Sequence, residues 1–263
     1  MLINLRMLNS VSKGVIDNTY FRRVHFYLLV NTPASMWDKY EALNAVGKNV
    51  LGELKNCPEL AYNDIKVLIT IIEFDQTCRI THCAEDVLDF TWSSITEGQV
   101  ECACLGDAYG ILLDLLKEDK HNCCFSGRSF FPPIIICLCH SMPCGDYYEA
   151  LKFLKENSWF NLGSRLAIRI GDDDWVDGCL DDFTCDKHAV FVSNTAQELY
   201  SIFRSLIIAT FLATIKGKLD NVSLNQHRLQ YVYNHLSMVL DIHNASYTYS
   251  ENSWDVTLNT TCK

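Results

Sequence analysis

Five cysteine and histidine residues have positions that could form a metal site. Cys102 and Cys104 precede a segment with helical spacing, and Cys139, His140 and Cys144 follow an apolar strand pattern. When such segments belong to one parallel sheet, both face the crevice at the strand ends. Thiolate and imidazole ligands suit Zn²⁺ far better than Mg²⁺. A zinc site is therefore one hypothesis, and structural thiols are the other, because C-x-C is not the spacing usual in zinc sites.

The same segment also contains a candidate nucleophile and base, Cys144 and His140. Nucleophilic catalysis by cysteine needs a thiol with a lowered pKa and an oxyanion site near a helix N-terminus. The residues that flank Cys144 form no catalytic signature, and no Gly-x-Gly-x-x-Gly sequence follows the first strand pattern. We therefore predict that the protein is not an enzyme.

These residues must be positioned by strands, and five short apolar runs have strand character. Near-continuous apolar sequence, without alternation, is typical of strands buried on both faces of a parallel sheet. A sixth run, Arg79–Cys83, follows its predecessor across only a few polar residues, which favours an antiparallel edge strand in a hairpin. The five buried runs are Val24–Val30, Ile65–Phe74, Ile134–Cys139, Arg165–Ile170 and Ala189–Val192.

Segments with helical spacing lie between these runs. The strongest covers Met36–Leu54, and further apolar stripes begin at Leu105, Tyr147 and Leu199. Alternation of strands and helices predicts an α/β fold: a doubly wound, mostly parallel sheet with one antiparallel edge strand and helices on both faces.

The chain is expected to contain one domain with two flanking segments. Residues 1–21 form an N-terminal segment, 22–216 the domain, and 217–263 a C-terminal extension that packs on the domain or binds a partner. Within the extension, Leu224–Leu240 has helical character, and short strands are expected at Tyr247–Tyr249 and Val256–Leu258.

Charge and cysteine content indicate which kinds of partner the protein binds and in which compartment it is located. The 263 residues have a net charge of −10 and no run of basic residues, so binding to nucleic acid or to an anionic membrane is not expected. We find neither a signal-peptide pattern nor a membrane-spanning apolar run. Thirteen cysteines without a signal peptide predict reduced thiols and a cytoplasmic location.

Several segments together resemble a known family. They are RRVHFYLLVNTPASM, ITIIEFDQTCRI, CACLGDAYGILLDLL, PPIIICLCHSMPCGDYYEALKFL, GSRLAIRIGDDDWVDGCLDDFT and HAVFVSNTAQELYSIF. The chain over residues 22–216 resembles the von Willebrand factor A domain, in the bacterial form of the TerY-like proteins associated with tellurium resistance. The resemblance implies a crevice that holds Mg²⁺ through an Asp-x-Ser-x-Ser turn, a threonine and a second aspartate.

At those metal positions this chain has Asn31, Pro33, Ser35, Ala103 and His140. Four of the five residue types are changed, and both carboxylates are absent. Because Mg²⁺ needs several oxygen ligands and negative charge to offset its dehydration, we expect a degenerate metal site and no cofactor.

The resemblance then implies a non-enzymatic protein-interaction module. Its TerY-like form implies partnership with a protein kinase or phosphatase in a bacterial signalling or stress-response system. Trp37, Met142 and Tyr147 are candidates for a partner-binding rim, since aromatic and methionine side chains are frequent in contact hot spots. For Trp37, packing over the first helix explains the residue equally well. The alternative function is a zinc-binding sensor or enzyme that uses the Cys/His cluster in the same crevice.

Overall fold

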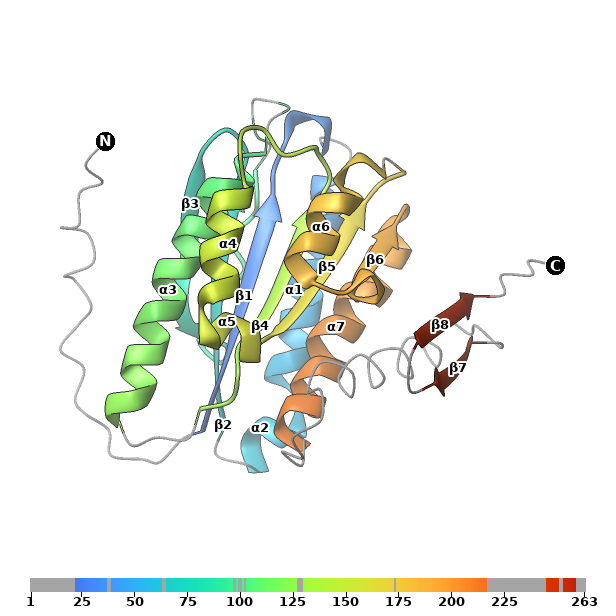
Figure 1. The fold of residues 1–263 in the computed structure, drawn as a ribbon. Helices are drawn as coiled ribbons and strands as arrows, with labels where there is room; N and C mark the ends of the chain where they lie inside the picture. The colour runs from blue at the N-terminus through green and yellow to red at the C-terminus, as the bar shows by residue number, and fades with distance from the viewer. Residues whose placement is uncertain are drawn as a thin grey trace.

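A six-stranded sheet forms the centre of the protein, with helices on both faces (Figure 1). The computed structural model describes residues 22–36, 39–62, 65–96, 98, 101, 103–126, 130–172, 174–216, 245–250 and 253–258. The strand order is β3-β2-β1-β4-β5-β6, and every pairing is parallel except that of β2 with β3. The predicted fold class, including the antiparallel edge strand, is confirmed.

The strands lie close to the expected ranges. They are β1 (Arg22–Asn31), β2 (Ile65–Phe74), β3 (Cys78–Asp86), β4 (Ile134–Cys139), β5 (Ser164–Ile170) and β6 (Val190–Ser193). All residues of β4 are buried, and so are nine of the ten in β2, because helices cover both faces of the central strands.

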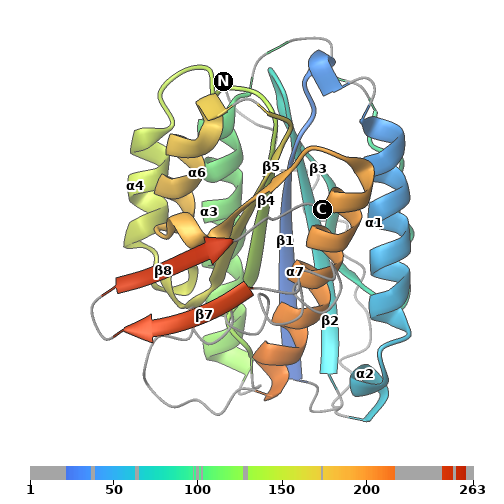
Figure 2. The ribbon, with the colours of Figure 1, turned by 90° about the vertical axis from the view of Figure 1, so that its right-hand side faces the viewer.

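Helices form one layer on each side of the sheet, as Figure 2 shows edge-on. The helices are α1 (Tyr40–Lys55), α2 (Pro58–Tyr62), α3 (Leu105–Ser126), α4 (Tyr148–Glu156), α5 (Ser158–Leu162), α6 (Asp177–Thr184) and α7 (Ala196–Lys216). Short 3₁₀ turns occur at η2 (Ala34–Met36), η3 (Asp174–Val176) and η4 (Lys187–Ala189). Helices α1 and α7 cover one face, and α3, α4 and α6 cover the other. The helix that the sequence predicted to begin at Met36 is α1, which begins four residues later, at Tyr40, after η2.

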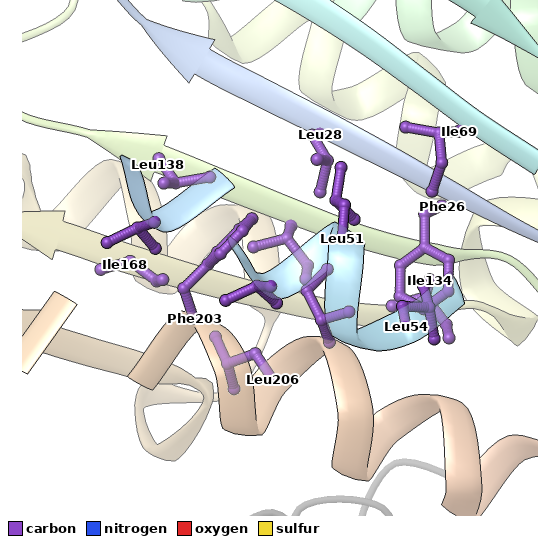
Figure 3. Close-up of a cluster of buried hydrophobic side chains, with 14 of the residues drawn as sticks. Phe26, Leu28, Leu51, Leu54, Ile69, Ile134, Leu138, Ile168, Phe203 and Leu206 are labelled. Carbon is purple, nitrogen blue, oxygen red and sulfur yellow. The ribbon is translucent and has the colours of Figure 1, made fainter. Parts of the chain in front are cut away.

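Two apolar clusters fill the spaces between the sheet and its helices. On one face, Phe26 and Leu28 of β1 pack with Leu51 of α1 and with Phe203 and Leu206 of α7 (Figure 3). On the other face, alternate residues of β1 pack against α3, α4, α5 and α6. All four predicted helical stripes are buried, so the apolar periodicity identified the inward faces correctly.

The connection after β3 packs along α1, which the sequence pattern did not predict. Asn44 of α1 accepts hydrogen bonds from Trp92 Nε1 at 2.9 Å and Ile95 N at 2.8 Å, and it donates to Ile95 O at 3.0 Å. One amide side chain thereby satisfies three groups of a segment about fifty residues away. Nearer the strand ends, the Tyr40 hydroxyl donates to Pro33 O at 2.7 Å.

The Trp92 indole lies against α1 where the helix has a glycine, which gives a testable prediction. A Cβ at Gly47 would come within 2.4 Å of the Trp92 ring, whereas a Cβ at Gly52 would meet none of the described atoms within 4 Å. We expect Gly47→Ala to lower the free energy of unfolding by about 1–3 kcal/mol through overpacking. Gly52→Ala, in the same helix, should raise it by up to ~1 kcal/mol through helix propensity. Urea denaturation of both variants measures this, and equal effects would contradict the packing of Trp92 on α1.

A buried polar network connects β1, β2, β3 and α3. His25 Nδ1 lies 2.6 Å from Asp119 Oδ2, and His25 Nε2 lies 2.8 Å from Thr70 Oγ1. The Tyr27 hydroxyl donates to the same oxygen of Asp119 at 2.5 Å. Thr70 Oγ1 also accepts from Ala84 N at 2.9 Å, where β3 has an irregular register and Ala84 a φ of 50°. The network therefore satisfies an amide that the irregular ladder leaves without a strand partner.

At the C-terminal end, β7 (Ala245–Ser250) and β8 (Ser253–Leu258) form a two-stranded antiparallel sheet. They include the two short strands predicted there, whereas the helix expected at Leu224–Leu240 lies outside the described residues. Within the described part of the chain, one helix, Ala196–Ile215 of α7, is long and apolar enough to cross a membrane. Because 61% of its apolar window is buried inside the protein, packing against the sheet explains that composition.

Candidate interaction site at the carboxyl ends of the strands

The carboxyl ends of β1, β4 and β5 meet at one edge of the sheet, at the top of Figure 1. The segments that surround this edge are the turn after β1, the loop before α3, the β4–α4 loop and the turn between β5 and α6. Parallel sheets bind ligands and partners at such an edge. The predicted metal-site and rim residues come from these segments.

Asn31, the last residue of β1, joins three strand ends through its side chain. Its Oδ1 accepts from Ser141 Oγ at 2.9 Å, Ser141 N at 3.0 Å and His140 N at 3.2 Å. Its Nδ2 donates to Phe74 O, at the end of β2, at 3.1 Å. The residue is fully buried. The amide oxygen is therefore occupied by three donors of the β4–α4 loop.

Ala103 holds the loop before α3 against the β4–α4 loop. It forms an isolated parallel bridge with Pro143, and its carbonyl accepts from Cys144 N at 3.0 Å. Ala103 is buried, and it is the residue that the resemblance places where the family has a threonine. Pro33 lies two residues after the end of β1, and Ser35 lies half-buried in η2.

His140 connects β4 to β5. Its Nδ1 lies 2.5 Å from Ile170 O, so this nitrogen carries a proton and donates to the carbonyl. The ring also lies beside Gly171, where a Cβ would approach it to 3.2 Å. Gly171 has a φ of +99°, a conformation that favours glycine. His140 thus fastens neighbouring strand ends together.

The predicted cysteine cluster is only partly brought together. Cys104 Sγ lies 3.6 Å from Cys144 Sγ, whereas Cys139 is buried and points to Asn31 Oδ1 at 3.7 Å and Ser141 O at 3.4 Å. Burial raises the pKa of the Cys139 thiol well above its ordinary value, so it stays protonated. Cys102 lies outside the described residues. Within the described ranges, no group of three or more His, Cys, Asp or Glu side chains has a metal-binding arrangement.

The expectation of reduced thiols is wrong at Cys144. Cys144 is disulfide-bonded. The other cysteines with described side chains have free thiols: Cys57, Cys78, Cys83, Cys104, Cys137, Cys139, Cys179 and Cys185. Most are small core or half-buried residues, as the composition suggested.

The predicted rim needs one correction. Tyr147 is only 9% exposed and packs against Tyr109 and Tyr148, so its ring belongs to the core. Met142 is exposed as expected, at 61%, and Trp37 lies outside the described residues. The sequence reasoning missed two exposed aromatic residues, Tyr148 at 62% and Trp175 at 72%. Tyr148 begins α4 and Trp175 lies in η3, and their absence from the predicted apolar stripes was the available signal.

Tyr109, the buried neighbour of Tyr147, has a hydroxyl with no hydrogen-bond partner among the described residues. Its ring stacks on Phe183 and is fully buried, and burial raises the pKa of its hydroxyl well above the ordinary value. An unsatisfied buried hydroxyl costs about 1–3 kcal/mol. We expect Tyr109→Phe to keep or raise the free energy of unfolding, by up to ~1 kcal/mol, in urea denaturation. A free energy of unfolding lower than that of the native protein by more than ~1 kcal/mol would contradict this expectation and would indicate a buried water that satisfies the hydroxyl.

Exposed carboxylates accompany the exposed apolar side chains at this edge. Asp146 lies in the β4–α4 loop, where its Oδ1 accepts from Tyr148 N at 2.9 Å. Asp172 and Asp174 are exposed in the turn after β5, next to Trp175. By contrast, a pocket of about 910 Å³ lies away from this edge, between α3, α4 and α5, where Leu113, Phe153 and Lys120 line it.

No family model matches the sequence, and no curated protein matches it. Solved structures do match. Proximal thread matrix protein 1 from the mussel byssus matches with a TM-score of 0.50 and 12% identity over 71% of this chain and 46% of its own. The open conformation of the pilus adhesin SpaC from Lactobacillus rhamnosus GG matches with a TM-score of 0.51 and 12% identity over 82% of this chain and 31% of its own. The fold is that of a von Willebrand A domain.

The ArnB paralog VWA2 from Sulfolobus acidocaldarius also matches, with a TM-score of 0.48 and 14% identity over 71% of this chain and 46% of its own. This chain covers less than half of each of these proteins. The sheet order and the two matches with TM-scores of 0.50 and 0.51 confirm the von Willebrand A fold predicted from the sequence. The TerY-like subtype and the loss of the metal site stay predictions.

Proposed function

We propose that this von Willebrand A domain is a non-enzymatic module that binds a protein partner at the carboxyl edge of its sheet without a bridging metal ion. The observation that carries the proposal is the side chain of Asn31. Its only oxygen already accepts from three donors of the β4–α4 loop.

The chemistry of the donor set supports the loss of the metal. A hard divalent cation takes about six oxygen ligands, with carboxylates among them. At the positions that the resemblance assigns to metal ligands, this chain offers a saturated amide oxygen, one serine hydroxyl and an imidazole that donates to a backbone carbonyl. These residues do not fit Mg²⁺, so no step of the proposed binding depends on it.

The surface at this edge indicates the chemistry of the partner. Met142, Tyr148 and Trp175 supply exposed apolar area, and Asp146 and Asp174 supply exposed negative charge nearby. Apolar anchors contribute most of the affinity of an interface, while complementary charge guides orientation and association rate. The partner surface we infer is apolar at its centre and basic around it.

In its finer form, the proposal follows the TerY-like resemblance. The partner would be a protein kinase or phosphatase in a bacterial signalling or stress-response system, and the location cytoplasmic. The net charge of −10 supports a protein partner rather than nucleic acid or a membrane.

Thermal unfolding tests the loss of the metal site. A ligand that binds the native state raises its stability by about 2.7 kcal/mol at ~100 times the dissociation constant. We expect the same melting temperature in excess Mg²⁺, excess Mn²⁺ and chelator, at matched ionic strength. A saturable rise with Mg²⁺ would contradict the proposal, and a rise with Zn²⁺ alone would favour the alternative of a zinc-binding Cys/His sensor or enzyme.

Site-specific photo-crosslinking in cells tests the binding edge. A photoreactive residue at position 142 or 175 is expected to capture a protein partner, with the same yield after chelator is added to the lysed cells. The matched control is position 162, where Leu162 is 52% exposed on α5, away from this edge. Equal capture at all three positions, or capture abolished by chelator, would contradict metal-independent binding at the carboxyl edge.

A further inference from the structure

Basic side chains line a groove in one of the two helical layers. The groove lies between α3, α4 and α5 and has a volume of about 910 Å³. Four lining residues share one face of α3, because they are four, three and one residues apart: Leu113, Lys117, Lys120 and His121. Phe153 of α4 also lines the groove and is 48% exposed. The groove therefore combines exposed apolar surface with basic side chains.

The lysines of the groove are only weakly neutralised. The Lys120 ammonium donates to Ser158 Oγ at 2.7 Å, where α3 meets α5. Lys117 lies 3.2 Å from Asp114, in an exposed ion pair of the kind that contributes little energy. Among the described lining residues, Glu156 is the one carboxylate. In a chain with a net charge of −10, the groove is a local basic region that suits an anionic occupant.

The carboxyl edge of the sheet has the complementary character. Trp175 is 72% exposed in η3, and Met142 is 61% exposed in the β4–α4 loop. Asp172 and Asp174, close to Trp175 in the chain, are exposed as well. An aromatic anchor beside carboxylates matches an apolar groove beside ammonium groups. Both surfaces that such a contact requires are present on this one chain.

We propose that the groove binds the carboxyl edge of a second copy of this chain, with Trp175 as the anchor. The Trp175 indole packs on Leu113 and Phe153, and the carboxylates of Asp172 and Asp174 pair with the lysines of α3. The groove is large enough for this side chain, since cavities of about 300–1,000 Å³ hold ligands larger than an indole. The inference rests on the proposed function, because it names one partner of the edge that we assign to protein binding.

One copy can use both surfaces at the same time. The β4–α4 loop of the edge precedes Tyr148, the first residue of α4, whereas the groove includes Glu156, the last. These nine residues span roughly 13 Å, and Figure 1 shows α5 at the end of α4 that lies farther from the edge. A contact between two unlike surfaces is heterologous, so each copy meets one neighbour by its edge and another by its groove. The expected assembly is a head-to-tail chain of copies.

Sedimentation velocity of the full-length protein tests self-association. At low salt, the average sedimentation coefficient is expected to increase with protein concentration. The increase should diminish at about 1 M salt, where the screening length is only ~3 Å, because charge pairs contribute to the contact. A sedimentation coefficient that does not change with concentration at low salt would overturn the inference.

Two variants each disable one of the surfaces. Trp175→Ala removes the anchor, and Lys120→Glu reverses a charge in the groove. Each is expected to weaken self-association about tenfold or more, as for the loss of a central interface residue. The matched control is Lys48→Glu, the same change of charge at an exposed position of α1, on the other face of the sheet. Equal weakening by Lys48→Glu would mean that net charge alone controls association, which would contradict binding in the groove.

Mixing the two variants tests the head-to-tail geometry. The Trp175→Ala variant keeps an intact groove and the Lys120→Glu variant an intact edge, so a mixture contains one intact pair of surfaces. We expect heterodimers in the mixture and no larger species. Heterodimer formation also demonstrates that both variants fold. If circular dichroism shows both variants folded and the mixture stays as dissociated as each variant alone, the inference is wrong.

Photo-crosslinking at position 175 separates this inference from the proposed function. Capture of a second copy of the chain, joined to a peptide of α3 or α4, would support both. Capture of a different protein, while the purified chain does not self-associate, would support the proposed function and overturn this inference. Capture no greater than at the control position 162 would contradict both.

Discussion

Replacing Asn31 with alanine is expected to lower the free energy of unfolding by about 3–5 kcal/mol, because each buried polar group left unsatisfied costs about 1–3 kcal/mol. The variant removes the acceptor of His140 N and Ser141 N and the donor to Phe74 O. The strand ends of β1, β2 and β4 would then lose the side chain that joins them. Urea denaturation, with the slope of the transition compared between proteins, measures the loss.

A matched control is Asn56→Ala. Asn56 also donates through its side chain to a backbone carbonyl, that of Gly52, at 2.9 Å, but it does so at the surface. Surface substitutions of this kind change stability by about 0.5 kcal/mol or less. If Asn31→Ala costs no more than Asn56→Ala, Asn31 does not hold the β4–α4 loop, and the main support for the proposed loss of the metal site fails.

Replacing Asp119 with alanine is expected to lower the free energy of unfolding by about 2–5 kcal/mol, because two buried side chains lose their hydrogen-bond partner and each unsatisfied group costs about 1–3 kcal/mol. Asp119 Oδ2 contacts both His25 Nδ1 and the Tyr27 hydroxyl, at 2.6 and 2.5 Å. His25 and Tyr27 are buried in the sheet, so neither gains water in exchange. Asp114→Ala, on the exposed side of the same helix, is the control and should be close to neutral.

The contribution of Asp119 depends on pH with a definite sign. Burial alone would raise its pKa, but the hydrogen bond and charge of His25, with the Tyr27 hydroxyl and Arg23, outweigh burial and lower it. A lowered folded-state pKa stabilises the protein above the unfolded value, ~3.9, and this stability is lost as pH falls through the folded value. The difference in the free energy of unfolding between the native protein and the Asp119→Ala variant should therefore be largest near neutral pH and should decrease in acid. A difference that grows below pH ~4 would contradict this assignment.

The strands of the sheet were predictable because burial on both faces requires a recognisable apolar sequence. A central parallel strand must be apolar at nearly every position, and Ile65–Phe74 and Ile134–Cys139 coincide with their predicted ranges. Helical stripes mark the inward faces in the same way. The 3.6-residue period relates Tyr147 to Leu151 and Leu154, and all three are buried. That stripe was a better guide to Tyr147 than its position near a loop, which suggested an exposed rim.

Loop contacts were not predictable, since they join residues far apart in sequence through single polar groups. Asn44 satisfies Trp92 and Ile95, but an isolated asparagine in a helix carries no sign of a partner about fifty residues away. The contact between Cys104 and Cys144 likewise depends on the register of Ala103 with Pro143, which periodicity does not encode.

By itself the sequence determined the order of strands and helices, the antiparallel edge strand and the residue types at the strand ends. Those features follow from local periodicity and composition, which record which faces are buried. Only the tertiary structure decided that the Asn31 oxygen is occupied, that Tyr147 lies in the core and that Cys104 touches Cys144. These outcomes depend on how the crossovers bring separate loops to one edge of the sheet. No local pattern in the chain specifies how close those loops come to one another.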